Sequence, residues 1–349
     1  MRNGFTTGTC AAAAAKAATY GLVHQQKLEE VAITLPGGDR VNLPLTDVTI
    51  NPELAGASVR KDAGDDPDIT DKALIKVSVS FTPGSEVIVK GGAGVGVVTK
   101  PGLSVPVGKH AINPVPMQMI KTAIREVTDR GIQAVVEIPD GEKLAEKTFN
   151  PRLGVVGGLS ILGTSGIVKP FSSDAIRETL RLSLEVAEAS GVKRPILTPG
   201  RIGHRAIRKV FRITPEQVIE VGNEWGFILD HLPEHTFEEV LIVGHPGKLA
   251  KLIMGHWDTH SKRSPNAAPF VSELARSMFG ESAKLAETVE GVIESLEPQQ
   301  RENLAQSLAS KINQAVSSRL KTRVPVSTVL INLKSEMIGH YGDLRPWAL

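Results

Sequence analysis

The chain has 349 residues, of which 41% are hydrophobic, 22% are charged and 4% are aromatic. This length is enough for two ordinary globular domains with sizeable cores. The 40 Lys and Arg residues nearly balance the 38 Asp and Glu residues, and the net charge of +2 creates no field that would attract a nucleic acid. The shortage of aromatic side chains also argues against a base-stacking surface.

The single cysteine cannot form an internal disulfide, which favours a reducing cytoplasm and excludes a cysteine-rich zinc or iron–sulfur site. No apolar run approaches the roughly 20 residues needed to cross a bilayer. The Ala-rich beginning is interrupted by Lys16 and lacks the large aliphatic side chains of a secretory signal. We therefore expect an unprocessed, cytoplasmic protein that acts on a small molecule, with neither nucleic acid nor membrane as a partner.

The first half of the chain is predicted to form a strand-rich α+β domain. Residues 6–21 predict a helix, because threonines at its start can cap it, alanines propagate it and Gly21 ends it. Two β-type segments around the turn at 36–39 predict a hairpin. Further patterns predict strands at 74–81, 85–90 and 132–139, and a second helix at 114–130.

From about residue 151 the pattern changes to strand–loop–helix units, which predict a parallel sheet covered by helices. The units are GVV at 154–156 with helix 173–190, PILT at 195–198 with helix 201–212, and VLIV at 240–243 with helix 246–254. Residues 270–320 are predicted to be helical, and 324–333 to form a late buried strand. We therefore expect two domains, 1–150 and 151–349, the second of them α/β with a mostly parallel sheet.

Two glycine-rich segments are candidate ligand loops. In VIVKGGAGVG the glycines follow a predicted strand, where bare backbone amides could approach an anionic or ribose-bearing ligand. They lead into VVTKPGL and not into a helix, which excludes a dinucleotide-binding turn and leaves a plain β-turn with a bulge equally open.

The second segment, GGLSILGTSG at 157–166, follows the strand expected to open the second sheet, where doubly wound folds place their ligands. Ser165 does not lie in a G-x-S-x-G elbow, so an esterase-type nucleophile is excluded. These glycines could instead serve only to pack a helix on a strand.

Helix 201–212 is predicted to present four arginines on one face, namely Arg201, Arg205, Arg208 and Arg212. Such a face suits a ligand with several carboxylates or phosphates, because each guanidinium can bind a pair of oxyanions. A solvated helix face is the more common meaning of such a charge run.

The run KDAGDDPDITD at 61–71 holds five aspartates, a density that could bind a hard cation or ribose hydroxyls. It lacks a glycine at the position that an EF-hand loop requires, and it lacks that loop's terminal glutamate. An acidic run of this kind more often forms a solvated turn. Cys10 lies near a helix start, although a lone cysteine in an alanine run is more often buried packing.

The segment VGHPGKLAKLIMGHWDTHSK at 243–262 holds the strongest candidate substrate site. His245 and Lys248 lie where a strand turns into a helix, and free amides and the helix dipole favour an anion there. His256 and His260 are four residues apart, but no glutamate lies between them and the intervening residues weaken a helix. We therefore expect no metal bound by the protein.

Five sequence blocks occur in the order of a known family. They are FTTGTCAAAAAKAA (5–18), GGAGVGVVTKPGL (91–103), GKHAINPVP (108–116), NPRLGVVGGLSILGTSGIV (150–168) and GHPGKLAKLIMGHWDTHSK (244–262). Together they resemble the cobalt-precorrin-5B C(1)-methyltransferase family of anaerobic cobalamin biosynthesis, whereas the tail after about residue 330 matches poorly. The resemblance implies transfer of a methyl group from S-adenosylmethionine to carbon 1 of a cobalt-containing tetrapyrrole, giving cobalt-precorrin-6A.

The resemblance also implies functional roles for particular residues. It implies cofactor binding by the glycine-rich blocks, at Gly92, Gly94, Gly96, Gly157, Gly158, Gly163, Thr164 and Ser165. It implies substrate binding at Thr6, Thr7, Thr99, Lys100, Lys248 and Ser261, to which the arginine face adds Arg201, Arg205 and Arg208. His245 and His260 are the candidate bases for removing a ring proton, because an unperturbed imidazole titrates near pH 6.5.

Two other functions stay open at this point. A nucleotide-dependent phosphoryl-transfer enzyme with GGAGVG as its phosphate loop predicts magnesium-dependent ATP binding. A non-catalytic tetrapyrrole-binding protein predicts tetrapyrrole binding without S-adenosylmethionine binding. The sequence also leaves open whether the chain forms a homo-oligomer and which glycine-rich loop would hold the cofactor.

Overall fold

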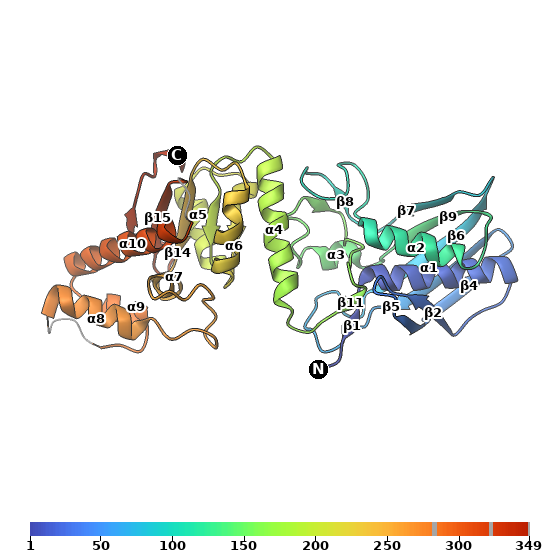
Figure 1. Cartoon of the computed structure of the whole chain (residues 1–349), viewed down its shortest axis with the longest axis horizontal. Helices are drawn as coiled ribbons and strands as arrows, with labels where there is room; N and C mark the ends of the chain where they lie inside the picture. Colours follow the sequence, from blue (N-terminus) through green and yellow to red (C-terminus); the bar gives the residue numbers. More distant parts are fainter. Residues whose placement is uncertain (281–284, 321–323, 348–349) are drawn as a thin grey trace. The chain divides into compact units, whose positions relative to one another are not determined.

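The computed structural model describes residues 1–280, 285–320 and 324–347. The chain divides into two compact units, Met1–Ser173 (unit 1) and Asp174–Leu349 (unit 2), whose elements are labelled in Figure 1. Each of the four hydrophobic clusters lies within one unit. The boundary expected after residue 150 falls before this division.

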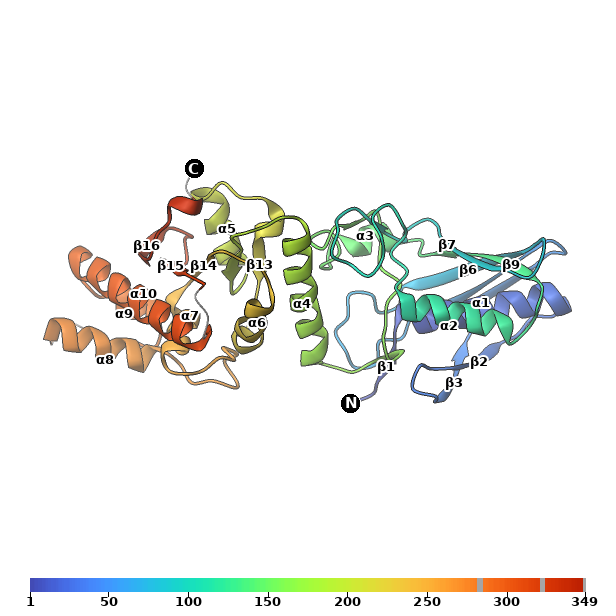
Figure 2. The same cartoon turned by 45° about the horizontal axis from the view of Figure 1, so that its top comes forward.

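Unit 1 is built on a mostly antiparallel sheet with the strand order β4-β5-β6-β9-β7. Its strands are β4 (Asp47–Ile50), β5 (Leu54–Arg60), β6 (Leu74–Thr82), β7 (Val87–Gly91) and β9 (Gly131–Glu137). Neighbouring strands are antiparallel except β7 and β9, which run parallel. Helices α1 (Thr7–His24) and α2 (Pro114–Arg125) lie side by side in both views, and α1 packs against β5 and β6 (Figures 1 and 2).

The alanine-rich sequence of α1 lets this helix pack closely on the sheet. Every residue from Cys10 to Ala15 is buried. The hydroxyl of Thr6 caps the helix by accepting the amide hydrogen of Thr9, and Gln25 ends it in a left-handed conformation. The predicted helix is therefore confirmed, although it continues past Gly21.

Short pairings complete unit 1. They are the expected hairpin of β2 (Glu30–Thr34) with β3 (Arg40–Pro44), β8 (Val97–Val98) with β10 (Val155–Val156), and β1 (Gly4–Phe5) with β11 (Ile167–Val168), besides the short helix α3 (Gly141–Ala145). The expectation that GVV at 154–156 opens the second sheet is wrong. Those residues pair with β8 instead, and Val155 packs into a small core with Val98 and Val105.

Unit 2 is built on a sheet with the strand order β13-β12-β14-β15-β16. Its strands are β12 (Ile196–Thr198), β13 (Val218–Glu220), β14 (Val240–Gly244), β15 (Val326–Ile331) and β16 (Met337–Tyr341). The first four are parallel and β16 is antiparallel to β15. The predicted fold class, a strand-rich α+β part followed by an α/β part with a mostly parallel sheet, is confirmed.

Helices cover both faces of this sheet. They are α4 (Ser173–Ala189), α5 (Arg201–Val210), α6 (Trp225–His231), α7 (Pro246–Ile253), α8 (Ala268–Phe279), α9 (Val289–Glu294) and α10 (Pro298–Leu320), with 3-10 turns η1 (Pro215–Gln217), η2 (Leu232–Glu234) and η4 (Arg345–Trp347). Ile196 and Leu241 pack in one core with α5, whereas Leu197 and Ile242 pack in another with α6, α7 and α10. No helix in the described ranges is long and apolar enough to cross a membrane.

Candidate functional site

The two threonines of the N-terminal block hold a loop of unit 1. The Thr7 hydroxyl lies 3.1 Å from the carbonyl oxygen of Ser160 and accepts the amide hydrogen of Leu162 at 2.9 Å. Thr6 and Thr7 are only 5% and 3% exposed. The structure therefore brings residues 6–9 and the loop 157–166 together, and it occupies both hydroxyls with the chain's own groups. Their role in substrate binding stays a prediction.

Three glycines of the two candidate loops pack against the chain's own backbone. A Cβ at Gly94 would lie 1.8 Å from the carbonyl oxygen of Ile138, and one at Gly158 would lie 2.2 Å from that of Gly94. A Cβ at Gly96 would lie 2.7 Å from the Gly158 carbonyl oxygen. The Gly96 amide donates to Leu159, whose own amide donates to Gly94. Close packing of three backbone segments accounts for these glycines without a ligand.

The rest of the predicted cofactor residues are partly accessible. The amide of Gly92 donates to the Val136 carbonyl, and a Cβ at Gly163 would lie 2.4 Å from the Thr6 hydroxyl. The three exposed members of the set are Gly157, Thr164 and Ser165. The Ser165 hydroxyl bonds within its own loop to Ile167, so cofactor binding at these positions stays a prediction.

Thr99 and Lys100 stabilise the pairing of β8 with β10. Both the amide and the hydroxyl of Thr99 donate to the carbonyl of Gly154, at 2.7 and 2.8 Å. The Lys100 stem covers Gly154, where a Cβ would lie 2.4 Å from its Cγ, and its ammonium is 3.5 Å from the Arg152 carbonyl oxygen. These contacts give both residues a structural role, and their substrate role stays a prediction.

The acidic run 62–71 binds its own chain. Asp62 pairs with the Arg2 guanidinium and accepts the Gly64 amide hydrogen, and these two contacts lower its pKa to about 2. Asp68 lies 2.6 Å from the ammonium of Lys61, whose side chain is 2% exposed. The remaining aspartates accept backbone amides: Asp65 from Arg2, Asp66 from Phe171 and Asp71 from Ala63. The run therefore serves to fasten the N-terminus and its neighbouring loops.

In unit 2, polar groups from separate sequence blocks meet at the carboxyl edge of the parallel strands. Lys248, in the first turn of α7, donates to the side-chain oxygen of Asn223 at 3.0 Å. The Thr259 hydroxyl lies 3.3 Å from the same oxygen. Burial lowers the pKa of Lys248, the charge of Lys251 lowers it further, and the Glu220 carboxylate opposes both. The G-H-x-G-K and T-H-S blocks thus meet at Asn223, which the sequence did not single out.

His245 has both ring nitrogens engaged. Its Nδ1 accepts the amide hydrogen of Gly247 at 3.0 Å and so caps α7, while Nε2 lies 2.8 Å from a carboxylate oxygen of Glu290. Because Nδ1 is the acceptor, the ring proton lies on Nε2 and is donated to Glu290. In this arrangement neither nitrogen offers a lone pair to a substrate, and the geometry supports a role in positioning α7. The role of catalytic base stays a prediction.

His260 uses one ring nitrogen within its own turn. Its Nδ1 accepts the amide hydrogen of Lys262 at 3.1 Å, so the neutral ring carries its proton on Nε2 as a hydrogen-bond donor. Ser261 beside it is exposed. His256 and His260 lie beyond the end of α7, and within the described ranges no three His, Cys, Asp or Glu side chains gather as a metal site.

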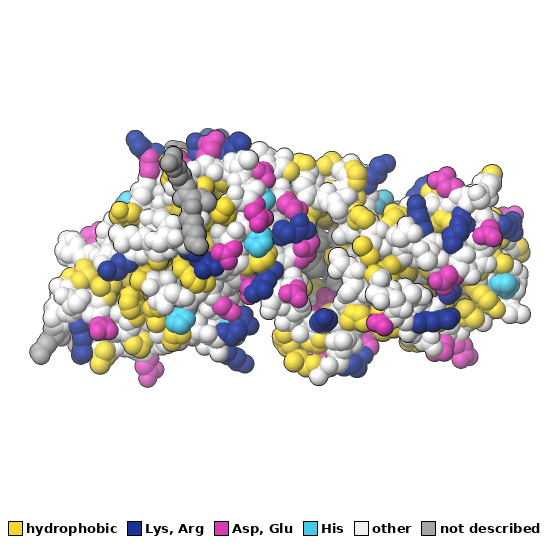
Figure 3. All heavy atoms as spheres, in the orientation of Figure 1, with side chains coloured by type: hydrophobic (Ala, Val, Ile, Leu, Met, Phe, Trp, Pro, Cys, Tyr) yellow, Lys and Arg dark blue, Asp and Glu magenta, His cyan; other side chains and the backbone are white. Residues whose placement is uncertain are grey.

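Three arginines of the predicted face lie on α5, and all three are exposed: Arg201, Arg205 and Arg208. The prediction that Arg212 shares their helix is wrong. The helix ends at Val210, because Phe211 turns into an extended conformation and buries its ring between α5 and the sheet. On the face shown in Figure 3, charged side chains of both signs are interspersed.

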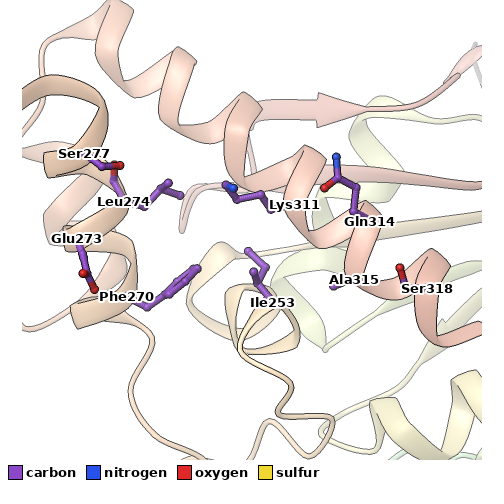
Figure 4. Close-up of a pocket in the computed structure, with 9 residues that line it drawn as sticks. All are labelled: Ile253, Phe270, Glu273, Leu274, Ser277, Lys311, Gln314, Ala315 and Ser318. Atoms are coloured by element: carbon purple, nitrogen blue, oxygen red, sulfur yellow. The ribbon is translucent and has the colours of Figure 1, made fainter.

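A hollow of about 560 Å³ also opens on unit 2, among α7, α8 and α10 (Figure 4). Its walls include Ile253, Phe270 and Leu274, with Glu273 on α8 and Lys311 on α10. Ile253 is the last residue of α7, whereas Lys248 lies in its first turn. None of the candidate site residues lines this hollow.

Comparison with known proteins gives the family. The profile of CbiD matches residues 1–170, and the profile of the CbiD C-terminal domain matches residues 258–342. A protein of Syntrophotalea carbinolica named cobalt-precorrin-5B C(1)-methyltransferase is 51% identical over 349 aligned positions, and the alignment covers 99% of each chain. A protein of the same name from Methanocaldococcus jannaschii is 40% identical and covers 97% of this chain and 96% of its own.

A crystal structure of the cobalamin biosynthesis protein (cbiD) from Archaeoglobus fulgidus is also similar. It is 31% identical, covers 75% of this chain and 82% of its own, and has a TM-score of 0.39. The two curated relatives match nearly from end to end, at identities well above 30%. The chain therefore belongs to the CbiD family of cobalt-precorrin-5B C(1)-methyltransferases.

Proposed function

We propose that this chain methylates carbon 1 of cobalt-precorrin-5B with S-adenosylmethionine as the methyl donor, giving cobalt-precorrin-6A. The observation that carries the proposal is the 51% identity to the Syntrophotalea carbinolica relative over the whole chain. A bond forms between the methyl group and carbon 1 as the bond from sulfur to that methyl breaks, and the sulfur keeps the electron pair. The chain's one cysteine is buried and unpaired, and we place the reaction in the cytoplasm.

Such a transfer makes modest demands on the protein. S-adenosylmethionine supplies an electrophilic methyl group when it is bound. The displacement is in line, so the protein mainly has to hold two ligands in register and exclude water, which contributes up to roughly 7–11 kcal/mol. Glycine turns and polar clamps meet these demands without a catalytic triad.

The carboxyl edge of the unit 2 sheet supplies clamps for the tetrapyrrole. The ring carries acetate and propionate groups, which are anionic at neutral pH. Lys248, held in place by Asn223, and the exposed Arg205 and Arg208 offer cations for these groups. His260 adds an Nε2 donor, and His245 contributes by capping the helix that carries Lys248.

The test is a labelled transfer reaction. The purified chain, cobalt-precorrin-5B and S-adenosylmethionine carrying a ¹³C methyl group are incubated without added nucleotide. We expect a product heavier by one labelled methyl, with the label bonded to carbon 1 in the NMR spectrum. Matched incubations omit the methyl donor or contain heat-unfolded protein.

Other outcomes would contradict the proposal or support one of the alternative functions. An unchanged mass with folded protein and intact substrate contradicts the proposal. Turnover that requires ATP and magnesium supports the phosphoryl-transfer alternative, and binding of the tetrapyrrole without methylation supports a carrier.

A further inference from the structure

We propose that the turn between β12 and α5, together with Glu220 at the end of β13, binds the ribose of a nucleoside ligand through its 2′,3′-diol. This inference rests on the proposed function, because the nucleoside is the adenosyl part of the methyl donor. It places the cofactor in unit 2, whereas the family resemblance implies the glycine-rich loops, both of which lie in unit 1.

The topology of unit 2 indicates where on the sheet a ligand would bind. In chain order the strands are arranged 2-1-3-4-5, and the connections after β12 and β14 lead to helices on opposite faces of the sheet. Doubly wound sheets with this order bind ligands at the carboxyl edge where the winding reverses. In unit 2 that point lies between β12 and β14, and it is formed by the Gly200 turn and the His245 turn.

Two glycines shape the Gly200 turn. Gly203 lets α5 lie close to the sheet, since a Cβ there would come within 1.8 Å of the Thr198 hydroxyl and 3.0 Å of the Val243 carbonyl oxygen. At Gly200 a Cβ would have only one described atom of another element nearby, an oxygen of Glu220 at 3.5 Å. The missing side chain at Gly200 is therefore not required by internal packing, and it leaves a cradle beside a carboxylate.

Thr198 adds an independent sign at the same place. Its side chain is fully buried, and its hydroxyl, which faces the first turn of α5 at Gly203, has no hydrogen-bond partner among the described residues. A buried hydroxyl without a partner is costly in a protein interior. The first turn of α5 therefore holds a polar group that the described residues of the chain leave unsatisfied.

Glu220 is positioned to bind the diol. It is opposite Thr198 in the parallel pairing of β12 with β13, so both side chains emerge on the face that α5 covers. A carboxylate can accept hydrogen bonds from two neighbouring hydroxyls, and an acidic residue about 20 positions after the glycine turn performs this task in doubly wound nucleotide sites. The spacing from Gly200 to Glu220 meets this rule.

Three candidate glycines of unit 1 offer a contrast, although Gly157 is open. At Gly94 and Gly158 the space of a Cβ is already filled by carbonyl oxygens of the chain itself, and at Gly96 it is filled by the Val155 side chain and the Gly158 carbonyl oxygen. Glu220 also lies near enough to Lys248 to influence its ionisation. Ribose at Glu220 and a substrate carboxylate at Lys248 would therefore be neighbours, as transfer between two ligands requires.

The experiment measures binding by calorimetry with S-adenosylhomocysteine as the probe, on the full chain and without substrate. We expect Glu220→Gln to weaken binding at least tenfold, because charge-assisted hydrogen bonds to the diol are lost. Glu239→Gln is the matched control. Glu239 is a half-buried glutamate just before β14, at the amino ends of the parallel strands. Ser165→Ala tests the opposing prediction, in which the loop of unit 1 holds the cofactor, and we expect Glu239→Gln to bind within about twofold of wild type.

Competition shows whether the diol is what Glu220 recognises. Adenosine should displace the probe from the wild-type chain far better than 2′,3′-dideoxyadenosine, and Glu220→Gln should abolish this difference. A merely structural role for Glu220 would weaken both competitors equally and so overturn the inference. Unchanged affinity of Glu220→Gln, or loss of affinity in Ser165→Ala alone, overturns it as well.

A second variant covers the case in which Glu220→Gln does not fold. Gly200→Val fills the cradle and leaves the carboxylate in place; weaker probe binding with a normal thermal midpoint supports the inference, and normal binding overturns it. Failure of the wild-type chain to bind the probe at all would refute the choice of methyl donor in the proposed function. Wild-type binding with an unaffected Glu220→Gln variant would refute only the location of the ribose at Glu220.

Discussion

Lys248 keeps its ammonium group in surroundings that oppose its charge. Burial and the neighbouring Lys251 lower the pKa of Lys248 below the usual 10.5, and a neutral asparagine side chain is its hydrogen-bond partner. A substrate carboxylate in its place would gain a charged hydrogen bond and relieve that opposition. The surroundings of the Lys248 ammonium group therefore favour the binding of an anionic ligand.

We expect Lys248→Met to weaken substrate binding by about 10- to 100-fold, as the loss of one charged hydrogen bond predicts. The thermal midpoint should stay within a few degrees, because the side chain lies at an edge and not in the core. Titration of substrate into the folded variant measures the effect. Lys193→Met, at an exposed lysine before β12, is the control and should bind normally.

The lowered pKa also predicts a direction with pH. Lys248 is charged below its pKa, so substrate affinity of the wild-type chain should fall as the pH rises, and it should do so below the ordinary lysine value. In Lys248→Arg the guanidinium stays charged, and this alkaline loss should disappear. An alkaline loss that persists in Lys248→Arg, or normal binding by Lys248→Met, would contradict the substrate role.

The sequence predicts single site residues only where the chemistry is local. His245 and Lys248 were found from a strand-to-helix turn, and both lie at the carboxyl edge as expected. Asn223, Glu290 and Glu220 were missed, because their significance comes from contacts with residues distant in the chain. For Glu220 a signal existed: two glycines after a buried strand, followed about 20 residues later by an acidic strand end.

At the scale of elements, α5 has one buried side and one basic side. Ala206 and Ile207 pack on the sheet, while Arg201, Arg205 and Arg208 are exposed. The helix follows β12 at the carboxyl edge, so its first turn borders the proposed ribose site. This placement is why we assign the exposed arginines to the carboxylate rim of the tetrapyrrole.

We expect the double variant Arg205→Ala with Arg208→Ala to raise the substrate KM strongly and to leave the affinity for S-adenosylhomocysteine nearly unchanged. Both side chains are exposed, so the thermal midpoint should change little. Steady-state kinetics at low salt gives the KM, since screening weakens exposed charges at high salt. An unaltered KM under these conditions would show that the face is simply solvated.

Elements were predicted well where a periodic pattern met a clear end signal. The hairpin of β2 with β3, the strands β12 and β14, and the helices α1, α4 and α7 all appear near their expected positions. The role of the glycine-rich segments was harder to predict. Their glycines are required by close backbone contacts between residues such as Gly94, Ile138 and Gly158. Such contacts join separate parts of the chain, and no local pattern reveals them.

At the scale of the whole molecule, the hydrophobic clusters of the two units are separate. In unit 1 the core surrounds α1, and burial raises the pKa of Cys10 in that helix to about 12. In unit 2 the parallel sheet lies between two cores. This separation leads us to propose that the units fold as independent domains.

The fragment 174–349 tests both this independence and the location of the cofactor. We expect it to unfold cooperatively and to bind S-adenosylhomocysteine within about threefold of the full chain, because the Gly200 turn and Glu220 lie within it.

The fragment 1–173 should fold without binding the probe. Its one thiol, Cys10, should resist an aromatic disulfide reagent at pH 8 and react fully in urea, since a thiol with its pKa near 12 stays protonated and buried until the unit unfolds. Rapid reaction of Cys10 in buffer would show that unit 1 does not fold alone, and probe binding by fragment 1–173 would return the cofactor to the glycine-rich loops.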